Sequence, residues 1–265
     1  MTRYDLEAMV DKTLEVSGQT SLYYIGHSQG TLTMFSKLSY DANFAAKIRK
    51  FFALAPMGYL AHIRGLLRFI GDYIWGLFAA LYTRLGSEQF TGDSWVTSLY
   101  ASVACPISVG RDLCSPLYFL LGGPKTEQYV ATRASIYTGH FPAGTSTKNI
   151  RHFMQLIRSN GTVPRYDYGT TAANLQHYGT LIPPAYNFSA IETDMYLYWS
   201  DADYLADVHD VRERMLKWLN PKFLLQDNHI TGFNHFDFVW GAQSADLVVN
   251  PIIGLIRDDA AAMCK

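Results

Sequence analysis

The sequence has no marked excess of charge of either sign, because 22 Lys and Arg residues stand against 23 Asp and Glu residues in 265. A net charge of −1 gives no basic surface that could attract a polyanion, so we expect no nucleic-acid partner. The low contents of proline (10) and glycine (20), with 49% hydrophobic residues, exclude a disordered or collagen-like chain. The composition therefore predicts a globular protein with a large core.

Long apolar runs are also missing. The longest uncharged stretches in the first half, 73–83 and 94–110, are too short or too interrupted for the ~20 apolar residues of a membrane-spanning helix. We therefore expect no transmembrane segment. Residues 1–14 include early acidic residues and no apolar core, so no signal peptide is visible. Either the protein is cytosolic or the beginning of the chain is missing.

Cysteine is scarce, with only three residues, Cys105, Cys114 and Cys264. The first two lie nine positions apart and could close a small loop through a disulfide, and two buried free thiols are an equal alternative. Two glycosylation sequons begin at Asn160 and Asn187, and they matter only if the chain is secreted.

The order of the predicted elements indicates an α/β fold with an insertion. Periodicity and Gly/Pro boundaries predict a helix, strand, helix and strand at 4–17, 21–25, 31–40 and 51–55. Residues 60–190 change character, with amphipathic helices and dense aromatics. The alternation then resumes as strand, helix, strand and helix at 195–199, 208–219, 223–226 and 244–263. We therefore expect an α/β core formed by 1–59 and 191–265, with a helical cap at 60–190.

The segment Gly26-His27-Ser28-Gln29-Gly30 fits the nucleophile-elbow pattern, in which a serine occupies a strained turn between a strand and a helix. The two glycines would relieve crowding in this turn. The following helix would place its positive end below a developing oxyanion, and the backbone N–H of Gln29 could donate to that oxyanion. Ser28 is therefore the candidate nucleophile.

A serine needs a base, usually a histidine that a carboxylate orients, and in hydrolases the acid and then the histidine follow the serine along the chain. Asp201 and Asp203 both follow the predicted strand 195–199, and His235 follows the predicted strand 223–226. His229 is the competitor of His235, whereas His27 is expected to make a local contact. No spacing of His, Cys, Asp and Glu resembles a metal site, and no cofactor is expected.

Several segments together resemble the acid lipase family, the group that contains gastric lipase and lysosomal acid lipase. They are YIGHSQG at 24–30, PAGTS at 142–146, PPAYN at 183–187, LADVHDV at 205–211 and NHFDFVW at 234–240. The resemblance selects Asp203 over Asp201 as the catalytic acid and His235 as the base. It also implies an α/β-hydrolase fold and a disulfide between Cys105 and Cys114.

By this resemblance, we expect the protein to be a serine-dependent lipase that hydrolyses neutral lipids, triacylglycerols and cholesteryl esters, at a lipid–water interface. A secreted or lysosomal location is implied, with glycosylation at Asn160 and Asn187. Family members carry a signal peptide, several strands and the second oxyanion donor before the segment matched at Tyr4, and we expect this chain to lack them. The alternatives are a non-catalytic lipase-like lipid-binding protein and an esterase for small soluble esters.

Overall fold

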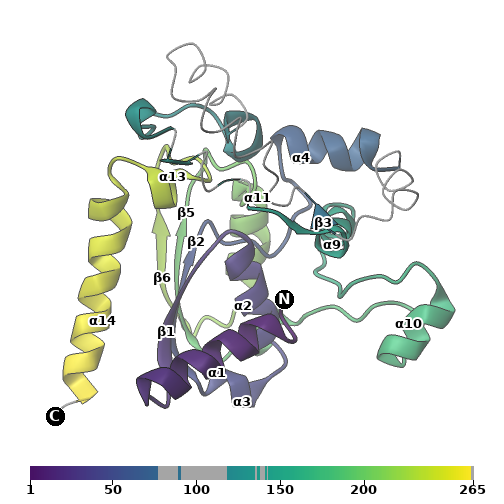
Figure 1. Ribbon diagram of the computed structural model, residues 1–265, viewed down its shortest axis with the longest axis horizontal. Coiled ribbons are helices and arrows are strands. Elements are labelled where there is room, and N and C mark those ends of the chain that lie inside the picture. The colour runs from purple at the N-terminus through teal and green to yellow at the C-terminus, as the bar shows by residue number, and fades with distance from the viewer. Residues whose placement is uncertain (77–88, 91–117, 135, 138–140, 142, 264–265) are drawn as a thin grey trace.

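A computed structural model of the protein describes residues 1–76, 89–90, 118–134, 136–137, 141 and 143–263. Its centre is a four-stranded parallel sheet with the strand order β1-β2-β5-β6 (Figure 1). The strands are β1 (Leu22–His27), β2 (Ile48–Leu54), β5 (Asp194–Trp199) and β6 (Leu224–His229). Because all four strands are parallel, their carboxyl ends meet at one edge of the sheet, where the loops that follow them converge.

Helices cover both faces of this sheet. Figure 1 shows α14 (Asn250–Met263), which continues η5 (Ala245–Val249), on one side, and α2 (Gln29–Leu38) on the other side. α1 (Asp5–Ser17) packs Leu6 and Val10 into the core and ends at Gly18, whose φ of 66° suits a residue without a side chain. Both faces of β2 are buried, as the fully enclosed Phe51 and Phe52 show. The alternation of strands and covering helices confirms the predicted α/β architecture.

The segment between β2 and β5 contributes no strand to the four-stranded sheet in the part that the structure describes. It contains the helical elements α4 (Gly65–Phe69), η1 (Ile70–Ile74), η2 (Ala131–Arg133), α9 (Thr147–Ile157), α10 (Thr171–Tyr178) and η3 (Phe188–Ala190). Two short strands, β3 (Gln89–Phe90) and β4 (Thr145–Ser146), pair antiparallel beside α9. Among the described residues, no helix has the length and apolar character that crossing a bilayer demands.

Some element boundaries differ from those the sequence predicts. β2 begins three residues earlier than expected. Arg49 and Lys50 precede the apolar run, and their ion pairs with Asp259 and Asp194 allow these charged residues to lie in the strand. β6 extends to His229, three residues beyond the predicted end of this strand at Gln226. The predicted helix 208–219 consists of α11 (Val208–Asp210), η4 (Val211–Met215) and α12 (Leu216–Trp218). Cys105, Cys114 and their expected disulfide lie outside the described residues.

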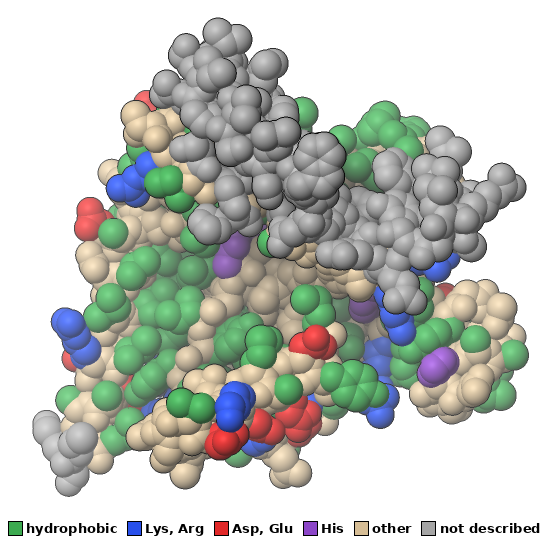
Figure 2. Space-filling model, viewed as in Figure 1, with side chains coloured by type: hydrophobic (Ala, Val, Ile, Leu, Met, Phe, Trp, Pro, Cys, Tyr) green, Lys and Arg blue, Asp and Glu red, His purple; other side chains and the backbone are tan. Residues whose placement is uncertain are grey.

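Apolar side chains gather on the face of the molecule between α14 and α1, beside the edge strand β1 (Figure 2). Ile25, in the middle of β1, is 53% exposed, and Met9 of α1 and Ile253 of α14 are also exposed. β1 ends at His27, directly before Ser28.

Candidate active site

Ser28 occupies a strained turn between β1 and α2. Its φ of 56° and ψ of −123° lie outside the conformations that residues with a side chain prefer. A Cβ at Gly26 would lie 2.8 Å from the ring of Tyr24 and 3.2 Å from the backbone of Gly30, so this position requires glycine. At Gly30 a Cβ would meet only the Tyr24 hydroxyl at an ordinary 3.5 Å, so the expected crowding is found at the first glycine alone.

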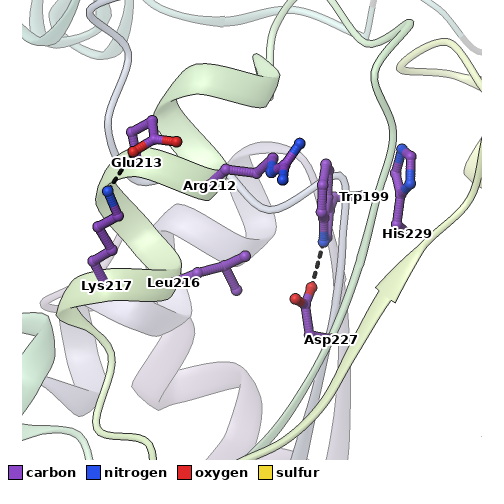
Figure 3. Close-up of a pocket in the computed structure, with 7 residues that line it drawn as sticks. All are labelled: Trp199, Arg212, Glu213, Leu216, Lys217, Asp227 and His229. Carbon is purple, nitrogen blue, oxygen red and sulfur yellow. Dashed lines mark hydrogen bonds and ion pairs between the residues drawn. The ribbon is translucent and has the colours of Figure 1, made fainter.

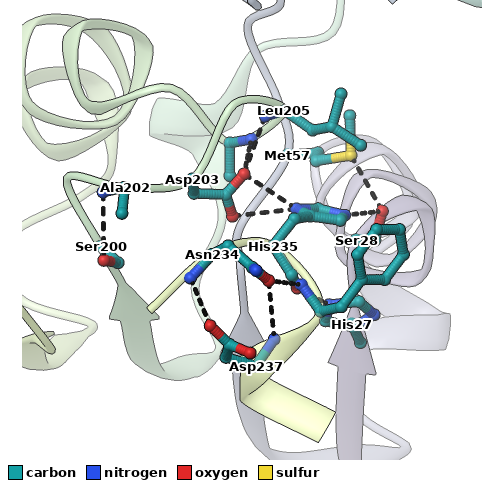
Figure 4. A network of polar contacts seen from close by, with 12 residues as sticks. His27, Ser28, Met57, Ser200, Ala202, Asp203, Leu205, Asn234, His235 and Asp237 are labelled. Atoms are coloured by element: carbon teal, nitrogen blue, oxygen red, sulfur yellow. Dashed lines mark hydrogen bonds and ion pairs between the residues drawn. The ribbon is translucent and has the colours of Figure 1, made fainter. Parts of the chain in front are cut away.

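The structure brings Ser28, His235 and Asp203 together (Figure 4). The Ser28 hydroxyl oxygen lies 2.7 Å from Nε2 of His235, and Nδ1 of His235 lies 2.9 and 3.0 Å from the two carboxylate oxygens of Asp203. The acid and the imidazole are shielded from solvent, with exposed fractions of 0% and 1%. A carboxylate on one imidazole nitrogen and a hydroxyl on the other is the arrangement that allows a histidine to take a serine proton.

Asp203 and Asp201 face different partners, although both follow β5. Oδ1 of Asp203 also accepts hydrogen bonds from the backbone N–H groups of Leu205 and Ala206, at 2.8 and 2.9 Å, which fix the carboxylate within its own turn. Asp201 instead lies 3.2 Å from Nε2 of His229, and both of these side chains are exposed. The two candidate acids and the two candidate bases therefore form two separate pairs, and only the buried pair reaches Ser28.

His27 makes a long-range contact instead of the local one expected from its place in the elbow. Its Nε2 donates to the backbone carbonyl of His235 at 2.7 Å, across 208 residues of sequence, and the two rings are 4.9 Å apart. The carbonyl can only accept, so Nε2 of His27 must carry a proton. Burial, and then the neighbouring His235 ring, lower the pKa of His27 to about 4, so the ring is neutral at ordinary pH.

Met57, just after β2, touches the Ser28 hydroxyl. Its sulfur lies 3.2 Å from Oγ of Ser28, so the hydroxyl has a weak second acceptor besides His235. The backbone N–H of Met57 donates to the Thr31 hydroxyl, which in turn donates to the carbonyl of Ser28 at 2.6 Å. The periodicity of the run 51–55 marks a strand and gives no signal for the contact made by Met57.

Gly122 connects the loop that carries Asp203 to the loop that carries His235. Its carbonyl accepts hydrogen bonds from the backbone N–H groups of His235, at 2.9 Å, and Tyr204, at 3.2 Å. A Cβ on Gly122 would lie 2.6 Å from two ring carbons of Phe236, and Gly123 has a φ of 129° that only glycine adopts readily. Two adjacent glycines indicate only a loop, so the sequence gives no signal for the hydrogen bonds that the carbonyl of Gly122 accepts.

The loop that carries His235 is also held by residues 124–126, which follow Gly122 and Gly123. The Asp237 carboxylate accepts from the backbone N–H of Asn234 at 2.8 Å and from the Thr126 hydroxyl at 2.7 Å. Nδ2 of Asn234 donates to the carbonyl of Pro124 at 3.1 Å. Burial raises the pKa of Asp237, and its two hydrogen bonds oppose this increase. His235 is thus held on both flanks by residues 122–126.

Gln29 begins α2, where a backbone N–H has no acceptor within the helix. Its side-chain Nε2 donates to Oδ1 of Asn149 at 2.6 Å, and Nδ2 of Asn149 donates to the Thr145 hydroxyl at 2.9 Å. This chain of contacts joins the residue after Ser28 to β4 and α9. The sequon residues Asn160 and Asn187 are both exposed.

A separate hollow of about 460 Å³ lies beside β5, β6, η4 and α12 (Figure 3). Trp199 lies between Arg212 and His229 there, at ring distances of 6.0 and 4.4 Å. Several of its polar groups already pair, since Lys217 bonds Glu213 and the Trp199 indole donates to Asp227. None of the residues that line it belongs to the Ser28 site.

Comparison with known proteins reveals close sequence relatives, although no family model matches the chain. The chain is 47% identical over 261 residues to the lipase lipl-1 of Caenorhabditis elegans, covering 98% of this chain and 64% of the relative. It is 31% identical over 259 residues to human gastric triacylglycerol lipase, covering 98% of this chain and 63% of that protein. These similarities support the resemblance of the chain to the acid lipase family. The chain spans less than two thirds of the length of these relatives.

A solved structure supports the fold. A soluble variant of monoglyceride lipase from Saccharomyces cerevisiae matches with a TM-score of 0.50 and 14% identity, over 96% of this chain and 66% of that chain. With the parallel sheet and its flanking helices, this similarity shows that the chain has the α/β-hydrolase fold.

Proposed function

We propose that the protein is a carboxylic ester hydrolase in which Ser28 is the nucleophile, His235 the general base and Asp203 the orienting acid. The observation that carries this proposal is the continuous contact from the Ser28 hydroxyl through the His235 ring to the Asp203 carboxylate, at 2.7 and 2.9 Å. Sequence similarity gives independent support, because the relatives are named as lipases.

In the proposed reaction, Oγ of Ser28 attacks the ester carbonyl while Nε2 of His235 takes the hydroxyl proton. Asp203 holds the Nδ1–H and stabilises the imidazolium that forms. The backbone N–H of Gln29 donates to the oxyanion of the tetrahedral intermediate. His235 then returns its proton to the departing alcohol oxygen and leaves an acyl-serine. Water, activated by the same imidazole, attacks this acyl-serine and releases the carboxylic acid.

The proposed substrates are neutral lipids, triacylglycerols and cholesteryl esters presented at a lipid–water interface. Support comes from human gastric triacylglycerol lipase, whose name states its substrate. We further propose that residues 60–190 form a cap over the core of 1–59 and 191–265, because this segment supplies no strand to the described sheet while Gly122 and Asn149 reach the catalytic loops.

The family also supports a proposal about location. We propose that the protein enters the secretory pathway and functions outside the cell or in the lysosome, with a disulfide between Cys105 and Cys114. The exposure of Asn160 and Asn187 is consistent with glycosylation in that pathway.

The test compares the purified protein with its Ser28→Ala variant on p-nitrophenyl butyrate and on emulsified triolein. We expect the wild-type protein to hydrolyse both, with the rate on triolein rising as the substrate passes from monomer to emulsion, and the variant to be inactive. Full activity in the variant would contradict the role of Ser28. Binding of triolein without hydrolysis, and no reaction with a fluorophosphonate, would identify a lipid-binding protein instead.

A further inference from the structure

The loop that carries Asp203 is held from outside by one arginine. Arg64, just before α4, donates from Nη2 to the backbone carbonyls of Asp203, at 2.7 Å, and Asp201, at 3.1 Å. Its backbone N–H donates to the carbonyl of Tyr204 at 2.7 Å. Its guanidinium forms an ion pair with the buried carboxylate of Asp207, at 2.7 Å, and lies 4.5 Å from the Tyr204 ring centre.

These contacts reach the whole turn that fixes the acid. The Asp203 carboxylate accepts hydrogen bonds from the N–H groups of Leu205 and Ala206, so its direction depends on the backbone from 203 to 206. Arg64 donates to this backbone at its beginning, and its ion pair with Asp207 reaches the residue that follows the turn. A shift of Arg64 would therefore turn the carboxylate relative to the His235 ring, although Arg64 itself touches neither group.

We propose that Arg64 is a positioning residue for Asp203, an inference that depends on the proposed function. The planar guanidinium suits this task, because its Nη2 donates to two carbonyls while its charge is paired with the carboxylate of Asp207, whereas a lysine ammonium is a single point on a flexible stem. The neighbouring Gly65 keeps the segment close to the loop. A Cβ there would lie 2.4 Å from the carbonyl oxygen of Leu120 and 3.1 Å from the Tyr204 ring.

The first test uses Arg64→Lys, which keeps a positive charge beside Asp207 and loses the forked contacts. We expect kcat on p-nitrophenyl butyrate to fall about 10-fold to 100-fold, the range that a small misplacement of a catalytic group produces, while KM stays within about twofold. Arg68→Lys is the matched control, because Arg68 lies on the same segment and bonds Asp72 and the carbonyl of Ala61. It should retain the wild-type kcat.

A double-mutant cycle separates positioning from a general structural role. In an Asp203→Asn background, where the carboxylate is already lost, Arg64→Lys should change the rate of fluorophosphonate labelling of Ser28 by less than about twofold. A further 10-fold loss in that background would contradict action through Asp203. The proton resonance of Nδ1–H of His235 gives a second readout, and it should shift in Arg64→Lys and remain unchanged in Arg68→Lys.

If Arg64→Lys does not fold, the double variant Arg64→Gln/Asp207→Asn removes both charges and keeps a donor, and it should show a comparable loss of kcat. A folded variant of either kind with the wild-type kcat would overturn the proposal. Failure of both to fold would also overturn it, because Arg64 would then serve stability alone. Activity that survives Ser28→Ala would instead contradict the proposed function.

Discussion

Gly122→Ala should displace the loop that carries His235 without requiring an unfavourable backbone angle at that residue. The added Cβ would lie 2.6 Å from two ring carbons of Phe236 and 3.2 Å from Cβ of His235. Carbon atoms pack best at about 3.5–4.0 Å, so the loop must move by about 1 Å. The ring cannot simply swing away, because it stacks on Trp240 at 4.8 Å and meets Phe141 edge-on at 5.3 Å.

We expect this movement to carry His235 away from its 2.7 Å contact with Ser28 and to lower kcat about 10²-fold, since a 1 Å misplacement can cost this much. Initial rates on p-nitrophenyl butyrate, measured well below the unfolding temperature, give the value. The control is Gly254→Ala on α14, where an added Cβ has no neighbour within 4 Å. A Gly122→Ala protein with the wild-type kcat would show that the close approach does not hold His235 in place.

Three further predictions concern single side chains. Asp203→Asn should reduce kcat by about 10⁴-fold because the imidazole loses its orienting carboxylate, and a loss below 10-fold would exclude Asp203 as the acid. The folded protein lowers the pKa of His27 to about 4 from 6.5, so the stability present above pH 6.5 should be lost as the pH falls towards 4. The free energy of unfolding in urea should therefore differ less between pH 7 and pH 5 in His27→Gln than in the wild-type protein. The hydrogen bond from Arg49 lowers the pKa of Asp259 to about 2 from 3.8, so the stability that the charged Asp259 gives above pH 3.8 should be lost as the pH falls towards 2. In Asp259→Asn, the free energy of unfolding should therefore fall less steeply between pH 4 and pH 2.

The parts of the fold that are determined by residues close together in the sequence could be predicted. The strand, turn and helix around Ser28 are encoded within one short segment, because Gly26 and the apolar run before it determine the turn. The family resemblance then predicted the α/β-hydrolase fold, which the parallel sheet and its flanking helices confirm. The extent of β2 was underestimated, because the ion pairs of Arg49 and Lys50 with Asp259 come from a distant helix.

The contacts around the candidate site depend on long-range geometry. Asp201 and Asp203 have the same local context after β5, so local pattern leaves both open; the family resemblance favours Asp203, and the structure places Asp203 against His235 and Asp201 against His229. His27 bonds a carbonyl 208 residues away, and the contacts of Gly122 and Arg64 use backbone carbonyls, which carry no sequence signal. Residue type and periodicity therefore indicate which groups can react, whereas packing decides which groups meet.

The catalytic role of Ser28 can be examined in one experiment, by reaction of the purified protein with a fluorophosphonate and mass spectrometry of its peptides. Because the hydroxyl lies 2.7 Å from the His235 ring, we expect a single phosphonylated residue, Ser28, with labelling abolished in Ser28→Ala and strongly slowed in His235→Ala. An unlabelled protein, or a label on a different serine, would contradict the proposed nucleophile.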